Sequence, residues 1–115
     1  MFNESDMADV LTASLKTISE TVDMLHDLSE RIDQAIYDMG AGEVLETMNH
    51  DLCTFYEVAQ TAAGTLRVVG EMASRTERPE LVTHTTHVRE YLDGEIVTFI
   101  DMLKEHGMWQ EFMAA

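Results

Sequence analysis

Apolar residues in the first 39 positions of the chain recur every three or four residues. These positions are Met7, Leu11, Leu15, Ile18, Val22, Leu25, Leu28, Ile32, Ile36 and Met39. Their mean spacing is about 3.6 residues, which is the period of an α-helix and far from the period of two in a strand. The pattern therefore predicts a helix over about residues 6–39, and Gly40 and Gly42 are typical of its end.

A second apolar stripe follows at a more regular spacing. Its members are Leu45, Met48, Leu52, Phe55, Ala59, Ala62, Leu66, Val69 and Ala73. The steps alternate between three and four, with a mean of about 3.5 residues, the heptad period that keeps one seam against a partner helix. The pattern predicts a helix over 43–73. A weaker stripe of Val58, Thr65, Val68 and Met72 lies beside the first, so this helix is expected to contact more than one neighbour.

The third apolar stripe begins after a short polar link and Pro79, a residue that suits the first turn of a helix. Its positions are Leu81, Thr85, Val88, Leu92, Ile96, Phe99 and Leu103. Asp93-Gly94 is a turn signal that would divide this segment in two. Because the stripe passes through the dipeptide in phase, we expect one helix over 79–106, followed by a short apolar tail over 108–114.

These elements predict an all-α fold with one domain over residues 1–115. We expect an antiparallel up-down-up bundle of three long helices, because short links force consecutive helices to be antiparallel neighbours. A short C-terminal helix would follow, and self-association would complete or extend the bundle. A division at Asp93-Gly94 would instead give four helices.

The charge of the chain narrows the classes of partner. It has 22 acidic and 7 basic residues, a net charge of −15, which argues against direct binding to nucleic-acid phosphates or to an anionic membrane. No stretch approaches the ~20 apolar residues of a membrane span, and no signal peptide is visible. The single cysteine, Cys53, fits a reducing compartment. We therefore expect a cytoplasmic protein.

Acidic residues form a stripe on the first predicted helix. They are Glu20, Asp23, Asp27, Glu30 and Asp38. One interpretation is a surface that imitates nucleic-acid phosphates and so inhibits a DNA- or RNA-binding protein. This stripe has about half of the charge density along one DNA strand, so a neighbouring helix would have to supply the rest. The alternatives are a solvated face that keeps the protein soluble, or adaptation to high salt.

Two histidines of the third predicted helix have a spacing that metal ligands can use. His84 and His87 are three residues apart, so they lie on one edge of the third helix and could both ligate a metal. The di-iron bundle pattern needs Glu-x-x-His on two helices, whereas this chain has the reverse order, and only once. Boundary histidines with hydrogen bonds are the simpler interpretation, so we expect no metal and no cofactor.

The C-terminal tail is the candidate surface for a protein partner. Its apolar residues are Met102, Met108, Trp109, Phe112 and Met113. Tryptophan with neighbouring apolar groups is favoured at binding hot spots, and methionine adapts to irregular partners. The alternative is that the tail folds back and covers the end of the bundle near Gly40 and Gly42.

The sequence has no motif for nucleophilic catalysis, and although carboxylate pairs are numerous, an unbroken bundle offers few concave pockets in which they could act. It contains no Gly-x-Ser-x-Gly, no glycine-rich phosphate loop and no basic anion clamp. The sequence favours a non-enzymatic acidic helical protein that binds another protein and associates with itself as a homo-oligomer. The alternatives are an acidic nucleic-acid mimic and, third, a helical metal-binding protein.

Overall fold

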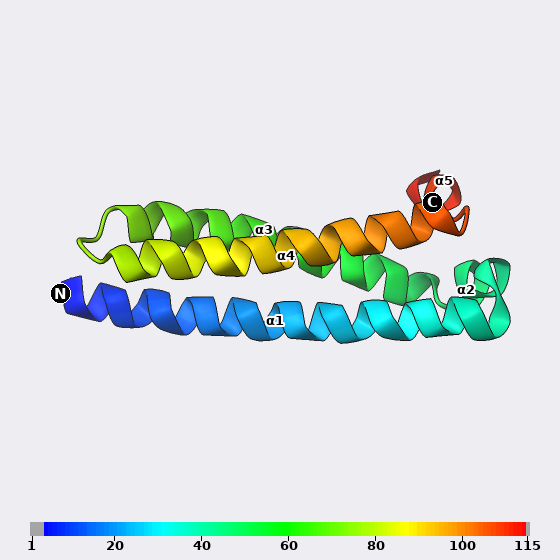
Figure 1. Cartoon of the computed structure of the whole chain (residues 1–115), viewed down its shortest axis with the longest axis horizontal. Coiled ribbons are helices and arrows are strands. Elements are labelled where there is room, and N and C mark those ends of the chain that lie inside the picture. The colour runs from blue at the N-terminus through cyan, green and yellow to red at the C-terminus, as the bar shows by residue number, and fades with distance from the viewer. Residues whose placement is uncertain (1–3, 115) are drawn as a thin grey trace.

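A computed structural model describes residues 4–114 of the chain and contains five helices in that range. They are α1 (Glu4–Met39), α2 (Ala41–Thr47), α3 (Asn49–Ser74), α4 (Pro79–Glu105) and α5 (Trp109–Ala114). The long helices α1, α3 and α4 lie side by side in a molecule of 53 × 21 × 19 Å (Figure 1). Residues 4–114 include no strand, so the all-α prediction is confirmed.

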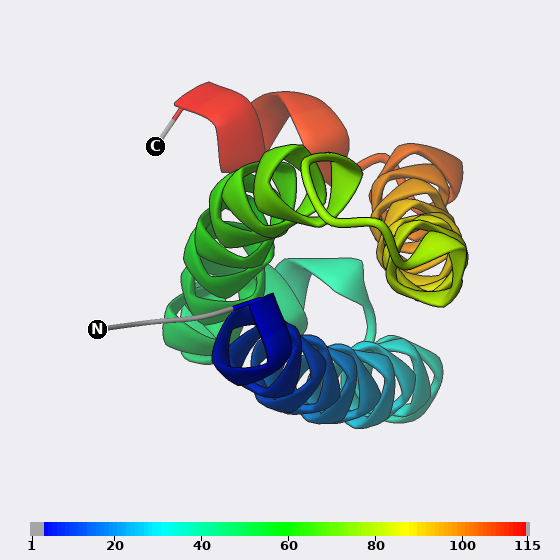
Figure 2. The same ribbon diagram turned by 90° about the vertical axis from the view of Figure 1, so that its left-hand side faces the viewer.

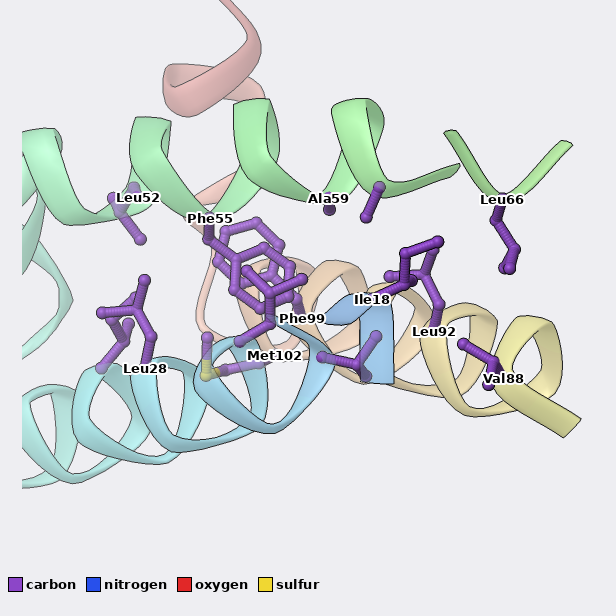
Figure 3. Close-up of a cluster of buried hydrophobic side chains, with 14 of the residues drawn as sticks. Ile18, Leu28, Leu52, Phe55, Ala59, Leu66, Val88, Leu92, Phe99 and Met102 are labelled. Carbon is purple, nitrogen blue, oxygen red and sulfur yellow. The ribbon is translucent and has the colours of Figure 1, made fainter. Parts of the chain in front are cut away.

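The three predicted apolar stripes form one core between the long helices. Seen from the end, α1, α3 and α4 surround a common axis, and each contacts the other two (Figure 2). At the centre, the rings of Phe55 and Phe99 stack with their centroids 4.0 Å apart and their planes at 19° (Figure 3). Ile18 of α1 belongs to the same cluster of buried side chains. Helical periodicity therefore identified the buried face of each long helix.

The second predicted helix differs from the observed chain at Met48. Instead of one helix over 43–73, α2 and α3 meet at this residue, whose φ of −117° and ψ of 20° depart from helical values. The prediction of a continuous helix was therefore wrong. The bend is local, because the hydrogen bonds on either side of Met48 are still made. The Met48 N–H still donates to the Val44 carbonyl at 2.8 Å, and the Leu52 N–H still donates to the Met48 carbonyl at 3.1 Å. Apolar spacing alone could not reveal such a bend.

The third long helix is continuous, as the in-phase stripe predicted. α4 runs from Pro79, in its first turn, through Asp93 and Gly94 to Glu105. The chain then turns at Gly107, where φ is +71°, a conformation that glycine adopts without steric cost. The Met108 N–H donates to the Leu103 carbonyl at 2.8 Å across this turn. Gly107 thereby directs α5 back against the bundle.

Candidate functional site

Two side-chain contacts join α1 to α4 across the surface of the bundle. The Tyr91 hydroxyl donates a hydrogen bond to Asp23 Oδ1 at 2.6 Å. One turn further along both helices, His26 Nδ1 lies 2.8 Å from Glu95 Oε1, and His26 Nε2 lies 3.2 Å from Glu30 Oε1. Successive turns of α1 therefore lie beside successive turns of α4, and polar contacts line the seam between the two helices.

The neighbouring carboxylates change the proton affinity of both contact residues. The hydrogen bond and the negative charge of Glu95 raise the pKa of His26 above 6.5 and outweigh the opposing effect of desolvation, and Glu30 and Asp27 raise it by smaller amounts. The hydrogen bond to Asp23, together with partial burial, raises the pKa of Tyr91 to about 12. Each residue thus keeps its proton more strongly in the folded state than in the unfolded chain.

Beyond these contacts, α1 and α4 enclose a groove of about 480 Å³, here called the acidic groove. The lining residues are His26, Ser29, Glu30, Asp33, Glu95, Thr98, Asp101, Met102 and Glu105. Neither lysine nor arginine lines it. Five carboxylates therefore face one concavity in which His26 is the one group able to carry a positive charge.

The predicted acidic stripe is exposed, and part of it belongs to this seam. The side chains of Glu20, Asp23, Asp27, Glu30 and Asp38 all lie at the surface. Asp23 contacts Tyr91 of α4 directly, whereas Glu30 pairs with His26 of its own helix, and His26 in turn contacts Glu95 of α4. Glu30 also lines the acidic groove, where α4 adds Glu95, Asp101 and Glu105. A neighbouring helix thus places further carboxylates beside the stripe.

The seam between α1 and α3 carries less charge, and Glu57 is the one charged residue in the lining of its groove. A groove of about 450 Å³ runs along it, lined by Thr21 of α1 and by Glu57, Val58, Thr61, Ala62 and Thr65 of α3. Residues three or four positions away from these lining residues lie on the same side of each helix and continue the seam along it. We call the resulting set the uncharged face: Val10, Ser14, Thr17, Thr21 and Met24 of α1, with Thr54, Val58, Thr61, Thr65, Val68 and Met72 of α3.

Exposed apolar groups make the uncharged face partly hydrophobic. Met24 is 69% exposed and Val68 is 50% exposed. The hydroxyls of Thr17 and Thr21 donate to the carbonyls of Ala13 and Thr17, at 3.1 and 3.0 Å, so their bonding capacity is partly used within α1. Of the weaker stripe seen in the sequence, Thr65 and Val68 are exposed along this seam, and Val58 and Met72 are half-buried against the core.

The structure divides the five C-terminal candidates between core and surface. Met102, Met108 and Phe112 are buried, Trp109 is half-buried, and Met113 is exposed. The Phe112 ring contacts Tyr56 of α3 and Phe99 of α4 edge-on, each with centroids 6.0 Å apart. α5 thus folds back, as the alternative expected, but against α3 and α4. An apolar surface of all five residues is not available to a partner in this conformation.

The remaining expectations concern metals and membranes. His84 is half-buried and His87 is exposed. Within residues 4–114, no cluster of three or more His, Cys, Asp or Glu side chains could hold a metal ion. Over the same range, none of the helices combines the length and apolar character needed to cross a membrane.

Sequence reasoning missed the contacts between α1 and α4, although a signal for them existed. His26 lies between Asp23 and Glu30 at steps of three and four, so it shares their side of α1. Tyr91 and Glu95 are one turn apart on α4. Their pairing depends on the relative register of two helices, which the spacing within each helix does not fix.

Comparisons of the chain with protein-family models, with curated proteins and with solved structures found no match.

Proposed function

We propose that this protein is a non-enzymatic binding module that acts through protein–protein contacts, and that its first partner is a second copy of itself. The bundle would be of the up-down-up kind, with the uncharged face extending it into a dimer. One observation carries this proposal: a chain with a net charge of −15 has a seam with eleven uncharged positions, none of which is fully buried by the helices of residues 4–114, and Glu57 is the one charged residue that lines its groove.

Electrostatics favours a second copy on this face. Two molecules of the same strong negative charge repel each other, and the repulsion is greatest where acidic side chains meet. An approach through the uncharged face keeps the carboxylates of the acidic groove away from the contact. A two-fold dimer would also place identical surfaces together, so the threonine and valine side chains of one copy would meet those of the other.

The length of the face suits a helical interface. On α3 it extends from Thr54 to Met72, about 27 Å at 1.5 Å per residue. On α1 it extends from Val10 to Met24, about 21 Å. Exposed Met24 and Val68 would supply apolar area that the monomer leaves in water.

Sedimentation over a concentration series tests this proposal. We expect the wild-type chain to pass from monomer to dimer as its concentration rises, and to do so more readily in added salt, which screens the repulsion. The variant Thr61→Glu/Thr65→Glu places charges on the face and should stay monomeric. A matched control, Gln60→Glu/Ala63→Glu, adds the same charge at exposed positions of α3 outside the face and should dimerise like the wild type. A wild-type monomer at every concentration, or equal effects of both variants, would refute the proposal.

The carboxylates that α4 adds beside the acidic stripe favour a second candidate function, the nucleic-acid mimic. In that case the partner is a DNA- or RNA-binding protein, and added salt should weaken the complex steeply. Charge reversal at the exposed Asp27, as Asp27→Lys, should weaken it further. Binding that persists at high salt and survives this reversal would contradict mimicry.

A further inference from the structure

One polar group that lines the acidic groove has no hydrogen-bond partner among the described residues. Ser29 is 5% exposed and lines the groove. Its hydroxyl makes no hydrogen bond to residues 4–114, yet every fully buried side-chain nitrogen or oxygen in that range has a partner. The Ser29 Oγ atom therefore reaches the open space of the groove. A ligand in the groove would meet this hydroxyl below the carboxylates.

We propose that the acidic groove is a binding site for a linear polyamine. Its ammonium groups would pair with the carboxylates, one of them would donate to Ser29 Oγ, and its methylene chain would lie over Met102 and Thr98. This site goes beyond the proposed self-association, because it uses the seam between α1 and α4 and leaves the uncharged face free.

The distribution of the carboxylates favours an extended organic cation over a metal ion. Glu95, Asp101 and Glu105 are spread over ten residues of α4, which is about 15 Å along its axis. A divalent metal instead requires several oxygens that converge at about 2.0–2.6 Å. The described residues contain no such convergent cluster. Ammonium groups separated by three or four methylenes can match carboxylates about one helical turn, ~5.4 Å, apart.

The dimensions of the groove favour a small molecule over a protein segment. Its volume of about 480 Å³ lies within the range of small-molecule sites. A stable protein interface needs about 800 Å² from each partner and is anchored by large apolar residues. Met102 is the one buried apolar side chain that lines this groove.

His26 leaves part of the groove's charge uncompensated. Its two nitrogens face Glu95 and Glu30, but the single positive charge of a protonated His26 offsets only one of the two negative charges. Asp33, Asp101 and Glu105 form no ion pair with residues 4–114. These three side chains are therefore the ones on which the affinity for a polyamine should depend most.

Calorimetric titration of the full chain with the linear tetraamine spermine tests the site. The variant Asp33→Asn/Asp101→Asn/Glu105→Gln should bind spermine about tenfold more weakly or worse, from three lost ion pairs. The control Glu71→Gln/Glu80→Gln/Glu90→Gln removes the same charge at exposed positions outside the groove and should keep the affinity within about twofold of the wild type. Ser29→Ala should weaken binding by roughly two- to tenfold, the effect of one hydrogen bond. Circular dichroism of each variant verifies that the helices remain.

Four results would overturn the proposal. Equal losses in the two triple variants would mean that spermine follows the net charge. Unchanged binding by Ser29→Ala would mean that no built site exists. Displacement of spermine by Mg²⁺ at equal charge concentration would indicate screening alone. Binding of a lysine-rich peptide without binding of spermine would assign the groove to a protein partner.

Discussion

The Tyr91 hydroxyl donates a hydrogen bond to the Asp23 carboxylate at 2.6 Å and so joins α4 to α1 at the surface of the bundle. The next contact along this seam joins His26 to Glu95, and both residues line the acidic groove. The register of the groove therefore depends on two polar contacts as well as on the apolar core beneath them.

Removal of the Tyr91 hydroxyl should destabilise the fold modestly. Tyr91→Phe is expected to lower the free energy of unfolding by about 1 kcal/mol at pH 8, the value of one partly solvated hydrogen bond. Because the pKa of Tyr91 is raised from 10.0 to about 12, its contribution is complete below pH 10 and is lost between those values. Urea unfolding at pH 8 to 11 measures the difference between wild type and variant, which should narrow above pH 10. Tyr37→Phe, at a tyrosine that is 87% exposed, is the control and should match the wild type throughout.

His26 should make stability depend on pH near neutrality. Its pKa lies above 6.5 in the folded state because Glu95, Glu30 and Asp27 surround it. The stabilisation is therefore complete below pH 6.5 and is lost as the pH rises through the raised pKa. The difference in unfolding free energy between wild type and His26→Gln should be largest at about pH 6 and should shrink by pH 8 to 9. The other four histidines are present in both chains, so their contributions cancel in this difference. A difference that grew with pH would contradict the assignment.

Truncation of the central aromatic pair should be costly. Phe99 stacks on Phe55 and also meets Phe112, so Phe99→Ala would leave a cavity where α3, α4 and α5 converge. We expect a loss of about 3–5 kcal/mol in unfolding free energy, measured by denaturant titration. The exposed Tyr37→Ala should change it by less than about 0.5 kcal/mol. Similar losses in the two variants would contradict the assignment of Phe99 to the core.

The glycines of the long helices should respond differently to alanine. A Cβ at Gly94 meets no atom within 4 Å, so Gly94→Ala should raise the free energy of unfolding by up to about 1 kcal/mol through helix propensity. A Cβ at Gly70 would lie 2.9 Å from Arg89 Nη2 and 3.2 Å from Thr85 Cγ2. Gly70→Ala should therefore gain less or lose stability, because buried Thr85 has little room to move. Thermal unfolding of both variants compares them, and an equal gain at both sites would show that α3 and α4 do not approach closely at Gly70.

The sequence alone did not determine whether the C-terminal tail packs on the bundle. The apolar pattern of residues 108–114 is equally compatible with a free binding surface and with a helix packed on its own bundle, because both require the same side chains. The turn at Gly107 and the contacts of Phe112 with Tyr56 and Phe99 decide for packing. Those contacts join residues that are far apart in the chain. The spacing of apolar residues within one helix gives no information about such contacts.

The amino-acid sequence by itself determined the helical class, the buried stripe of each long helix and the continuity of α4 through Gly94. It could do so because helical periodicity and apolar burial are properties of each segment alone. Tertiary structure decided the bend at Met48, the pairing of Tyr91 with Asp23 and of His26 with Glu95, and the separation of an acidic seam from an uncharged one. These features depend on how the helices are rotated and shifted against one another, and that arrangement arises from the packing of the whole core.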